Sequence, residues 1–302
     1  MNYINRRRKL IRLLESNSLD SLRIKKRQNI TYLTGTRDRG VVFFVSHKKT
    51  YLVKNGAIPA HLKRIRSKKG IVESLRILKD SDELRHIKKA CKDGCDIMNY
   101  AIRCIVPGIS ERSVKDKVEQ YIIKKGKKRA DFDIIIASGR NASMPHAVPS
   151  SKKIKEGEMV VIDLGAMNYG YNSDLTRTVF LGRIDRKCLR IYNIVLAAQK
   201  RAIEKIRPGI KANYIDNISR QYISKKGLGR YFIHGLGHGI GLETHEGPSI
   251  SKNSNITLKE NMVITVEPGI YMTGWGGIRI EDVVLVTKNG CKVLTSDCKK
   301  GL

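Results

Sequence analysis

Long apolar runs are missing from this 302-residue sequence, which also has a single tryptophan and only five phenylalanines. A membrane-spanning helix needs about eighteen or more consecutive apolar residues, so we expect no such helix. The opening stretch, MNYINRRRKLIRLLES, is basic but contains neither an apolar core segment nor a small-residue cleavage site. We therefore expect a surface helix there, rather than a secretory signal or a transit peptide.

Paired cysteine motifs are also missing. The six cysteines are scattered along the chain, and none of them forms a Cys-x-x-Cys pair. Clustered cysteines are typical of disulfide scaffolds and thiolate zinc sites. The pattern therefore predicts reduced thiols in a cytoplasmic protein.

Acidic residues are scarce relative to basic ones. The chain has 59 Lys and Arg against 28 Asp and Glu, a formal charge of +31, and residues 1–80 hold 21 basic and 5 acidic residues. Such a surplus favours contact with nucleic acid or another polyanion. However, the lysine runs lie at turns without aromatic residues between them, which is typical of a solvated surface. We therefore keep nucleic-acid binding as the second interpretation.

The hydrophobic pattern indicates a small α/β unit followed by a larger one. A basic amphipathic helix near the N-terminus precedes a β-rich run over residues 30–53. From Ser81, apolar residues recur at steps of three and four until Pro107-Gly108, which predicts a long helix. We place two domains on this pattern, residues 1–78 and residues 79–302.

Two 26-residue segments of the chain match each other without a gap. The first begins at Ala101 and the second at Ala202, and both end in a glycine, Gly126 and Gly227. Each segment predicts the end of one helix, a Pro-Gly turn and a second helix, which in the first copy follows Ser110 as its N-cap. A single duplication favours two pseudo-twofold halves over a repeat solenoid.

The first half continues into a predicted β-hairpin over residues 159–182 that carries two carboxylates. Asp163 and Asp174 are equidistant from a turn centred at residues 168–169. Residues symmetric about a hairpin turn face each other, with Cβ atoms about 5 Å apart. We therefore expect these two carboxylates to lie directly opposite each other.

The second half repeats this arrangement over residues 262–286, where Glu267 and Glu281 are equidistant from a central glycine. Like charges opposite each other destabilise a sheet, and an unpaired buried anion costs more. Arg177 and Arg279 could neutralise two of the four acids. The remaining negative charge favours bound divalent cations.

A glycine-rich stretch, HGLGHGIGLETHEGP, begins at His234 and carries three histidines within twelve residues. Glycine at this density lets the backbone approach another group closely, and histidine is a common metal ligand and proton carrier. His238 would add one neutral imidazole to the four carboxylates. Oxygen-rich ligation with one imidazole suits Mn, Co, Fe or Zn, and it argues against a thiolate zinc site. The sequence therefore predicts two divalent metal ions, with manganese preferred.

Five motifs resemble those of the metallopeptidase superfamily of methionine aminopeptidase, aminopeptidase P and prolidase, which has the pita-bread fold. The resemblance covers residues 80–290 through SGRNASMPHA, VIDLGAMNYGYNSDLTRT, HGLGHGIGLETHEGP, VEPGIY and GIRIED. It implies an α+β catalytic domain with pseudo-twofold halves. The PHA stretch and the preceding domain are similar to the aminopeptidase P/prolidase branch, although that creatinase/prolidase-like N-terminal domain is shorter here.

The resemblance implies a role for each matching residue. Its five metal ligands correspond to Asp163, Asp174, His238, Glu267 and Glu281. Glu267 would also take the proton from the attacking water, and His146 and His245 would orient the peptide and stabilise the oxyanion. His234 would line the substrate pocket with Arg279, which would also hold a carboxylate through both prongs of its guanidinium. The implied reaction is hydrolysis of the peptide bond after the first residue, with proline as the second.

Alternatives remain at this point. A methionine aminopeptidase would use the same ligands, but the PHAVPS stretch and the β-rich N-terminal domain argue against it. The sequence does not separate a dipeptidase (prolidase) from an aminopeptidase that acts on longer peptides. A nucleic-acid-binding or protein-binding relative on the same fold agrees with the charge but not with the complete ligand set. A homodimer is expected from the branch, although the short N-terminal domain weakens that expectation.

Overall fold

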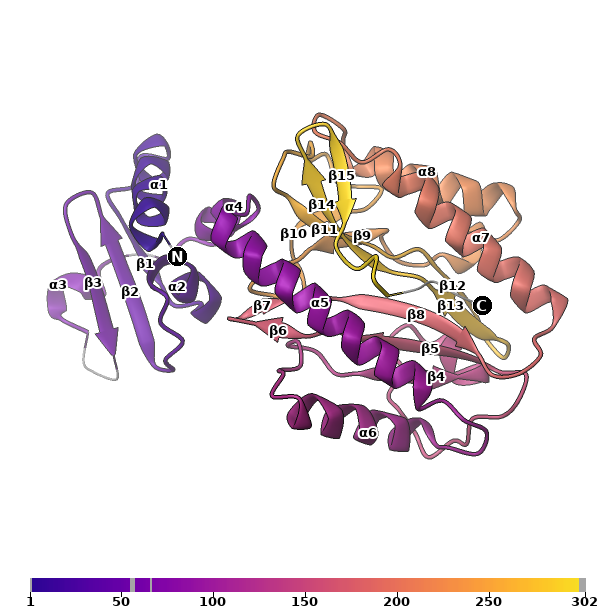
Figure 1. Ribbon diagram of the computed structural model, residues 1–302. Helices are drawn as coiled ribbons and strands as arrows, with labels where there is room; N and C mark the ends of the chain where they lie inside the picture. The colour runs from indigo at the N-terminus through magenta and orange to yellow at the C-terminus, as the bar shows by residue number, and fades with distance from the viewer. Residues whose placement is uncertain (1, 55–57, 66, 299–302) are drawn as a thin grey trace. The chain divides into compact units, whose positions relative to one another are not determined.

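The computed structural model describes residues 2–54, 58–65 and 67–298 (Figure 1). The chain divides into two compact units between Asp82 and Glu83. The predicted boundary after residue 78 lies just before this division. Among the described residues, no helix combines the length and the apolarity that crossing a membrane requires.

The N-terminal unit contains an antiparallel sheet of strand order β1-β2-β3. The elements of this unit are α1 (Tyr3–Ser16), β1 (Ser21–Ile24), α2 (Arg27–Thr34), β2 (Val41–Ser46), β3 (Thr50–Lys54), α3 (Ala60–Lys63) and α4 (Ile71–Arg76). Leu10 and Leu14 on one face of α1 are fully buried. This burial agrees with the amphipathic helix predicted at the N-terminus.

The predicted β-rich run is wrong at its start, because residues 27–34 form α2. Ile30 and Leu33 are both buried and lie three residues apart, a spacing that places them on one face of a helix. Gly35 follows the helix with a φ of 80°, a left-handed conformation that glycine adopts without strain. The later part of the run forms β2 and β3 as predicted.

Two pairs of long helices are present among the described residues of the larger unit. They are α5 (Ser81–Arg103) with α6 (Glu111–Lys124), and α7 (Arg186–Ile203) with α8 (Ala212–Lys225). The helices predicted from Ser81 and after Ser110 are confirmed. Ser110 caps α6, because its Oγ accepts the N–H of Ser113 at 3.1 Å.

In the view of Figure 1, α6 lies below the strands of the larger unit, α7 and α8 lie above and to the right of them, and α5 crosses in front. One antiparallel sheet has the order β4-β5-β8, a second has the order β10-β9-β11-β14-β15, and β6-β7 and β12-β13 form short ribbons. The first half contains β4 (Ile135–Ser138), η1 (Gly139–Ser143), β5 (Met159–Leu164), β6 (Met167–Asn168), β7 (Tyr171–Asn172) and β8 (Leu175–Phe180). The second contains η2 (Gly229–Tyr231), β9 (Gly237–Gly239), β10 (Glu246–Ile250), β11 (Val263–Val266), β12 (Gly269–Met272), β13 (Gly276–Arg279), β14 (Asp282–Thr287) and β15 (Gly290–Val293). The predicted α+β class is therefore confirmed.

The two halves repeat each other in backbone detail. Helices α6 and α8 begin and end 101 residues apart, the offset of the sequence match. The amide of Gly108 donates to the carbonyl of Ile154 at 2.8 Å, and the amide of Gly209 donates to that of Leu258 at 2.9 Å. Both glycines have a left-handed φ, 82° and 88°. The helix–turn–helix segment is therefore duplicated in structure as well as in sequence.

The second predicted hairpin has the expected register. Strand β11 pairs with β14, and β12 pairs with β13, in one continuous register centred on Gly274. Glu267 and Glu281 fall between these two ladders at matching positions. The hairpin therefore places these two carboxylates opposite each other.

The register predicted for the first hairpin is wrong, because Asp163 pairs with Thr176 and not with Asp174. The turn consists of Tyr169 and Gly170, whose φ angles of 48° and 79° are both positive, as the favoured two-residue hairpin turn requires. This turn lies one residue later than predicted, which moves the partner of Asp163 by two residues. Asp174 is therefore a diagonal neighbour of Asp163.

Candidate metal centre

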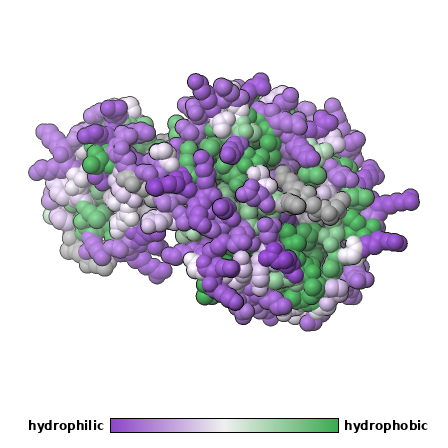
Figure 2. Space-filling model, in the orientation of Figure 1, coloured by the Kyte–Doolittle hydropathy of each residue, from purple (hydrophilic) through white to green (hydrophobic). Residues whose placement is uncertain are grey.

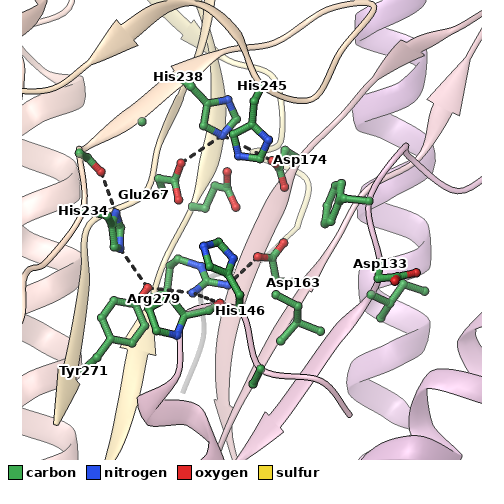
Figure 3. A pocket seen from close by; sticks show the side chains of 18 of the residues that line it. Asp133, His146, Asp163, Asp174, His234, His238, His245, Glu267, Tyr271 and Arg279 are labelled. Atoms are coloured by element: carbon green, nitrogen blue, oxygen red, sulfur yellow. Dashed lines mark hydrogen bonds and ion pairs between the residues drawn. The ribbon is translucent and has the colours of Figure 1, made fainter. Parts of the chain in front are cut away.

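Five side chains converge on one cavity of the larger unit (Figure 3). The cavity has a volume of about 760 Å³, and its wall includes Asp163, Asp174, His238, Glu267 and Glu281. Asp174, His238 and Glu281 offer ligand atoms that all lie within 4.8 Å of one another. The fold thus brings together every residue predicted as a metal ligand.

Arg279 holds Asp163 from inside the protein. Its Nη2 donates to Oδ2 of Asp163 at 2.5 Å, and the arginine is only 4% exposed. The predicted two-pronged contact is wrong, because the other nitrogens bind elsewhere: Nε donates to Oγ1 of Thr176 at 3.0 Å and Nη1 donates to Oη of Tyr271 at 2.8 Å. Oδ1 of Asp163 consequently has no hydrogen-bond partner in the described part of the chain.

Two threonines orient the glutamates. Thr176 Oγ1 donates to Oε2 of Glu281 at 2.7 Å, and Thr265 Oγ1 donates to Oε1 of Glu267 at 3.1 Å. Oε1 of Glu281, a residue 1% exposed, has no partner among the described residues. Within the described ranges, each half therefore contributes one buried carboxylate oxygen without a hydrogen-bond partner, and such a group typically costs about 1–3 kcal/mol.

His238 presents its Nε2 to the carboxylates. Its Nδ1 donates to the carbonyl of Gly239 at 3.1 Å, while Nε2 lies 3.2 Å from Oε1 of Glu267 and 3.7 Å from Oδ2 of Asp174. Anchoring one ring nitrogen on a carbonyl while the other faces a metal position is typical of metal-ligating histidine. His238 is therefore oriented as a ligand.

Burial and like charges dominate the electrostatics of this site. Burial, followed by the charges of neighbouring carboxylates, raises the pKa of Asp174 and the pKa of Glu281 well above their ordinary values. Burial also raises the pKa of Glu267, but the hydrogen bond and charge of His238 outweigh it and bring that pKa to about 2. For His238 burial lowers the pKa, whereas the contact with Glu267 raises it by more. Burial and mutual repulsion therefore make the negative charge of Asp174 and Glu281 costly unless a cation is bound.

Arginine matches only part of this negative charge. Arg279 contacts Asp163, but Arg177 pairs with Asp282 at 2.9 Å, outside the four predicted acids. Arg177 also donates to the backbone carbonyl of Glu281 at 2.5 Å. The unsatisfied carboxylate oxygens, the uncompensated charge and the imidazole together fit divalent cations with oxygen-rich ligation.

A chain of hydrogen bonds links His234 to Asp163. His234 Nδ1 donates to the carbonyl of Gly235 at 2.7 Å, and its Nε2 lies 3.1 Å from the hydroxyl of Tyr271. That hydroxyl accepts from Arg279, which in turn holds Asp163. Burial raises the pKa of Tyr271 to about 12. The hydroxyl therefore keeps its proton and donates a hydrogen bond to Nε2 of His234. His234 thus lines the cavity as predicted, in an orientation fixed by Tyr271.

His146 and His245 also line the cavity (Figure 3). The ring of His245 lies beside that of His238, with centroids 4.0 Å apart. Burial, followed by the charge of His238, lowers the pKa of His245. Both residues are therefore close to the carboxylates without belonging to the five-residue set.

Sequence reasoning missed three residues that shape this site: Thr176, Thr265 and Tyr271. Thr176 lies two residues after Asp174, and Thr265 lies two residues before Glu267. A spacing of two places each threonine on the same strand face as the nearby acid of its own hairpin. That spacing was a usable signal. The contact of Tyr271 with His234 depends on tertiary packing that no local pattern shows.

Comparisons with known proteins agree with this geometry. Residues 85–288 match metallopeptidase family M24, and residues 6–94 match the creatinase/prolidase N-terminal domain. The chain is 44% identical over 282 residues to an Xaa-Pro dipeptidase of Pyrococcus furiosus, which covers 93% of this chain and 80% of that protein.

Solved structures extend the likeness to the whole fold. An Xaa-Pro dipeptidase from Bacillus anthracis is 31% identical with a TM-score of 0.94, covering 100% of this chain and 99% of that one. An X-Pro aminopeptidase from Thermotoga maritima is 29% identical with a TM-score of 0.85, covering 96% of this chain and 97% of that one. The predicted pita-bread fold with a creatinase/prolidase-type N-terminal domain is confirmed, and the chain belongs to metallopeptidase family M24.

Proposed function

We propose that this metallopeptidase hydrolyses the bond between the first residue of a peptide and a proline in the second position. The observation that carries the proposal is the convergence of four carboxylates and one imidazole on a cavity wall, where two carboxylate oxygens find no hydrogen-bond partner among the described residues. Relatives named Xaa-Pro dipeptidase and X-Pro aminopeptidase support the substrate class.

Two divalent cations fit this donor set, with manganese preferred and cobalt, zinc and iron as alternatives. When bound, they would supply Lewis acidity and lower the pKa of water enough for attack at neutral pH. The residues that would hold them are Asp163, Asp174, His238, Glu267 and Glu281.

Glu267 is suited to accept a proton from the attacking water. In the metal-free site, the hydrogen bond and the charge of His238 keep this carboxylate ionised at neutral pH. The hydrogen bond from Thr265 fixes the orientation of Oε1. A positioned, ionised carboxylate of this kind acts as a general base when the water lies within hydrogen-bond reach.

His146 and His245 would hold the peptide and stabilise the oxygen that becomes negatively charged during the attack. The lowered pKa of His245 leaves it neutral at neutral pH, so one ring nitrogen can donate. His234 would contact the substrate from the side of Tyr271. Because its nitrogens are engaged by protein groups, Arg279 would act through Asp163 and Tyr271 rather than on the substrate directly.

The experiment that tests this function is metal removal and restoration, followed by assays of Ala-Pro, Ala-Pro-Ala and Met-Ala. We expect metal-dependent release of alanine from a proline-containing peptide. Cleavage of the dipeptide alone would make the protein a dipeptidase, and cleavage of the tripeptide would make it an aminopeptidase. Preferred cleavage of Met-Ala would contradict the proposal in favour of a methionine aminopeptidase.

Nucleic-acid binding remains the second candidate because of the charge of +31. On the face seen in Figure 2, hydrophilic side chains are spread over the surface rather than gathered in a single patch, which supports the solvated-surface interpretation. A salt titration of duplex DNA binding tests it, since phosphate contacts predict a steep loss of affinity with salt. The homodimer and the cytoplasmic location stay predictions. All six cysteines lie within the described residues and are free thiols.

Metal-free Glu281→Gln protein should be more stable than the wild type at pH 8. The raised pKa of Glu281 means that the folded state binds this proton more tightly than the unfolded chain. Wild-type stability therefore falls as pH rises above the ordinary glutamate pKa, whereas glutamine stays neutral. We expect a gain of about 1–3 kcal/mol at pH 8 and none near pH 4, measured by thermal unfolding in chelator.

Manganese should reverse this order, because the wild-type carboxylate then gains a cation that glutamine binds poorly. Glu260→Gln, at an exposed position, is the matched control and should show no pH-dependent gain. If the wild type were more stable than Glu281→Gln protein at pH 8 in chelator, Glu281 would not carry an uncompensated charge.

A further inference from the structure

We propose that Glu111 is a positioning residue for His146: its buried carboxylate fixes the segment of residues 138–150 that carries this histidine to the cavity. The inference rests on the proposed function, in which His146 contacts the substrate. Glu111 is the first residue of α6 and is fully buried, at 0% exposure. In the described part of the chain it is not among the residues that line the cavity, and its carboxylate accepts hydrogen bonds from Ser138, Asn141 and Ser150 rather than from a predicted metal ligand.

One carboxylate receives six hydrogen bonds from this segment. Oε1 accepts from the N and Oγ of Ser138 at 2.7 and 2.8 Å, and from Nδ2 of Asn141 at 3.1 Å. Oε2 accepts from the N and Oγ of Ser150 at 3.0 and 2.6 Å, and from the same Nδ2 at 3.0 Å. The two ends of the segment are thereby joined through Glu111.

The side chain of His146 depends on this frame. In the part of the chain that the structure describes, His146 makes no hydrogen bond of its own, and it is exposed at the cavity. The backbone on either side is held by two contacts: Nη1 of Arg279 donates to the carbonyl of Pro145 at 3.3 Å, and the amide of Ala147 donates to the carbonyl of Met144 at 3.2 Å. The position of the ring therefore follows the position of the segment.

The second pseudo-twofold half shows that the Glu111 carboxylate is not needed to dock the start of its helix. Glu111 N donates to the carbonyl of Lys152 at 3.1 Å, and Ala212, its counterpart in the second half, donates to that of Ile256 at 2.8 Å. Helix α8 thus keeps the same backbone contact with an alanine in place of the glutamate. A carboxylate is not needed to dock the helix, so its six hydrogen bonds serve the segment that holds His146.

Only an ionised carboxylate accepts on both oxygens with this geometry, because a glutamine presents an NH2 group to donors on one side. Glu111→Gln should therefore loosen one end of the segment while preserving side-chain volume. We expect kcat for Ala-Pro hydrolysis to fall at least tenfold with little change in KM or bound metal. Hydrogen exchange should accelerate in residues 139–150 but not in α6.

A double-mutant cycle tests whether the effect passes through His146. If it does, Glu111→Gln should lower kcat in the wild type but should have little further effect in His146→Ala protein. Glu111→Asp, which keeps both acceptor oxygens, should recover part of the loss. Ser110→Ala is the control for general destabilisation, since it removes the α6 cap without touching the segment, and it should lower Tm without lowering kcat.

The results that would overturn the role of Glu111 differ from the result that would overturn the proposed function. The positioning role is overturned if the Glu111→Gln protein has the kcat of the wild type. It is also overturned if Glu111→Gln lowers kcat by the same factor in the wild type and in His146→Ala protein. Unchanged exchange in residues 139–150 overturns it as well, without any activity measurement. A wild type that cleaves no Xaa-Pro peptide overturns the proposed function instead, and hydrogen exchange then tests the role of Glu111 alone.

Discussion

Replacing His238 with alanine should lower kcat/KM for an Xaa-Pro peptide by more than about a hundredfold and remove bound metal. Losing only a group that supports a metal ligand costs about 10–100-fold, and His238 itself faces Glu267 and Asp174 at 3.2 and 3.7 Å. The fold should persist, because the amide of His238, which donates to Thr265 Oγ1 at 3.0 Å, is unaffected. Metal content by mass spectrometry and peptide hydrolysis measure the two effects.

His47→Ala provides the matched control for this substitution. His47 belongs to the N-terminal unit, lies 3.5 Å from Glu15 and is not one of the residues that line the cavity. We expect full metal content and activity in the control. Full activity in His238→Ala protein would remove the basis for the metal assignment.

Replacing Arg279 with methionine should lower the free energy of unfolding of the chelated protein by about 3–5 kcal/mol. Removing one partner of a buried ion pair leaves the other charge without compensation, and that loss is typically of this size. Here the remaining charge is Asp163, and Thr176 and Tyr271 lose a donor as well. Urea unfolding in chelator measures the change.

Arg129→Met is the control, because Arg129 pairs with Asp133 at the same 2.5 Å, although the two side chains are 38% and 76% exposed. Exposed pairs contribute at most about 1 kcal/mol. Equal losses in the two variants would show that Arg279 does not compensate a buried charge. Adding Asp163→Asn to Arg279→Met should recover part of the stability, since it removes the uncompensated charge.

The parts of the structure that local pattern determines were predictable. The 101-residue offset gave both helix–turn–helix segments, because each turn depends on a Pro-Gly pair that is visible in the sequence. The hairpin around Gly274 was also predictable, since its acids are symmetric about a residue suited to the turn. All five ligands that the family motifs imply reach one cavity.

Other features depended on choices between near-equivalent local structures. The first hairpin turns at Tyr169-Gly170, and a shift of one residue was enough to separate Asp163 from Asp174 in the register. Residues 27–34 contain β-branched and aromatic side chains, yet tertiary burial of one face makes them helical. The single-pronged contact of Arg279 follows from two competing acceptors, Tyr271, which is 8 positions away, and Thr176, which is 103 positions away.

The metal centre draws its ligands from both pseudo-twofold halves, with Asp163 and Asp174 from the first and His238, Glu267 and Glu281 from the second. Contacts at the centre join residues as distant as Asp163 and Arg279, 116 positions apart. The centre therefore forms only after the halves have docked and the entropy of closing that long loop has been lost. A cation that binds ligands from both halves therefore stabilises their association. If the chain were cleaved between the halves, the fraction of fragments that stay paired would rise with the cation concentration, as it does for a heterodimer that shares a ligand.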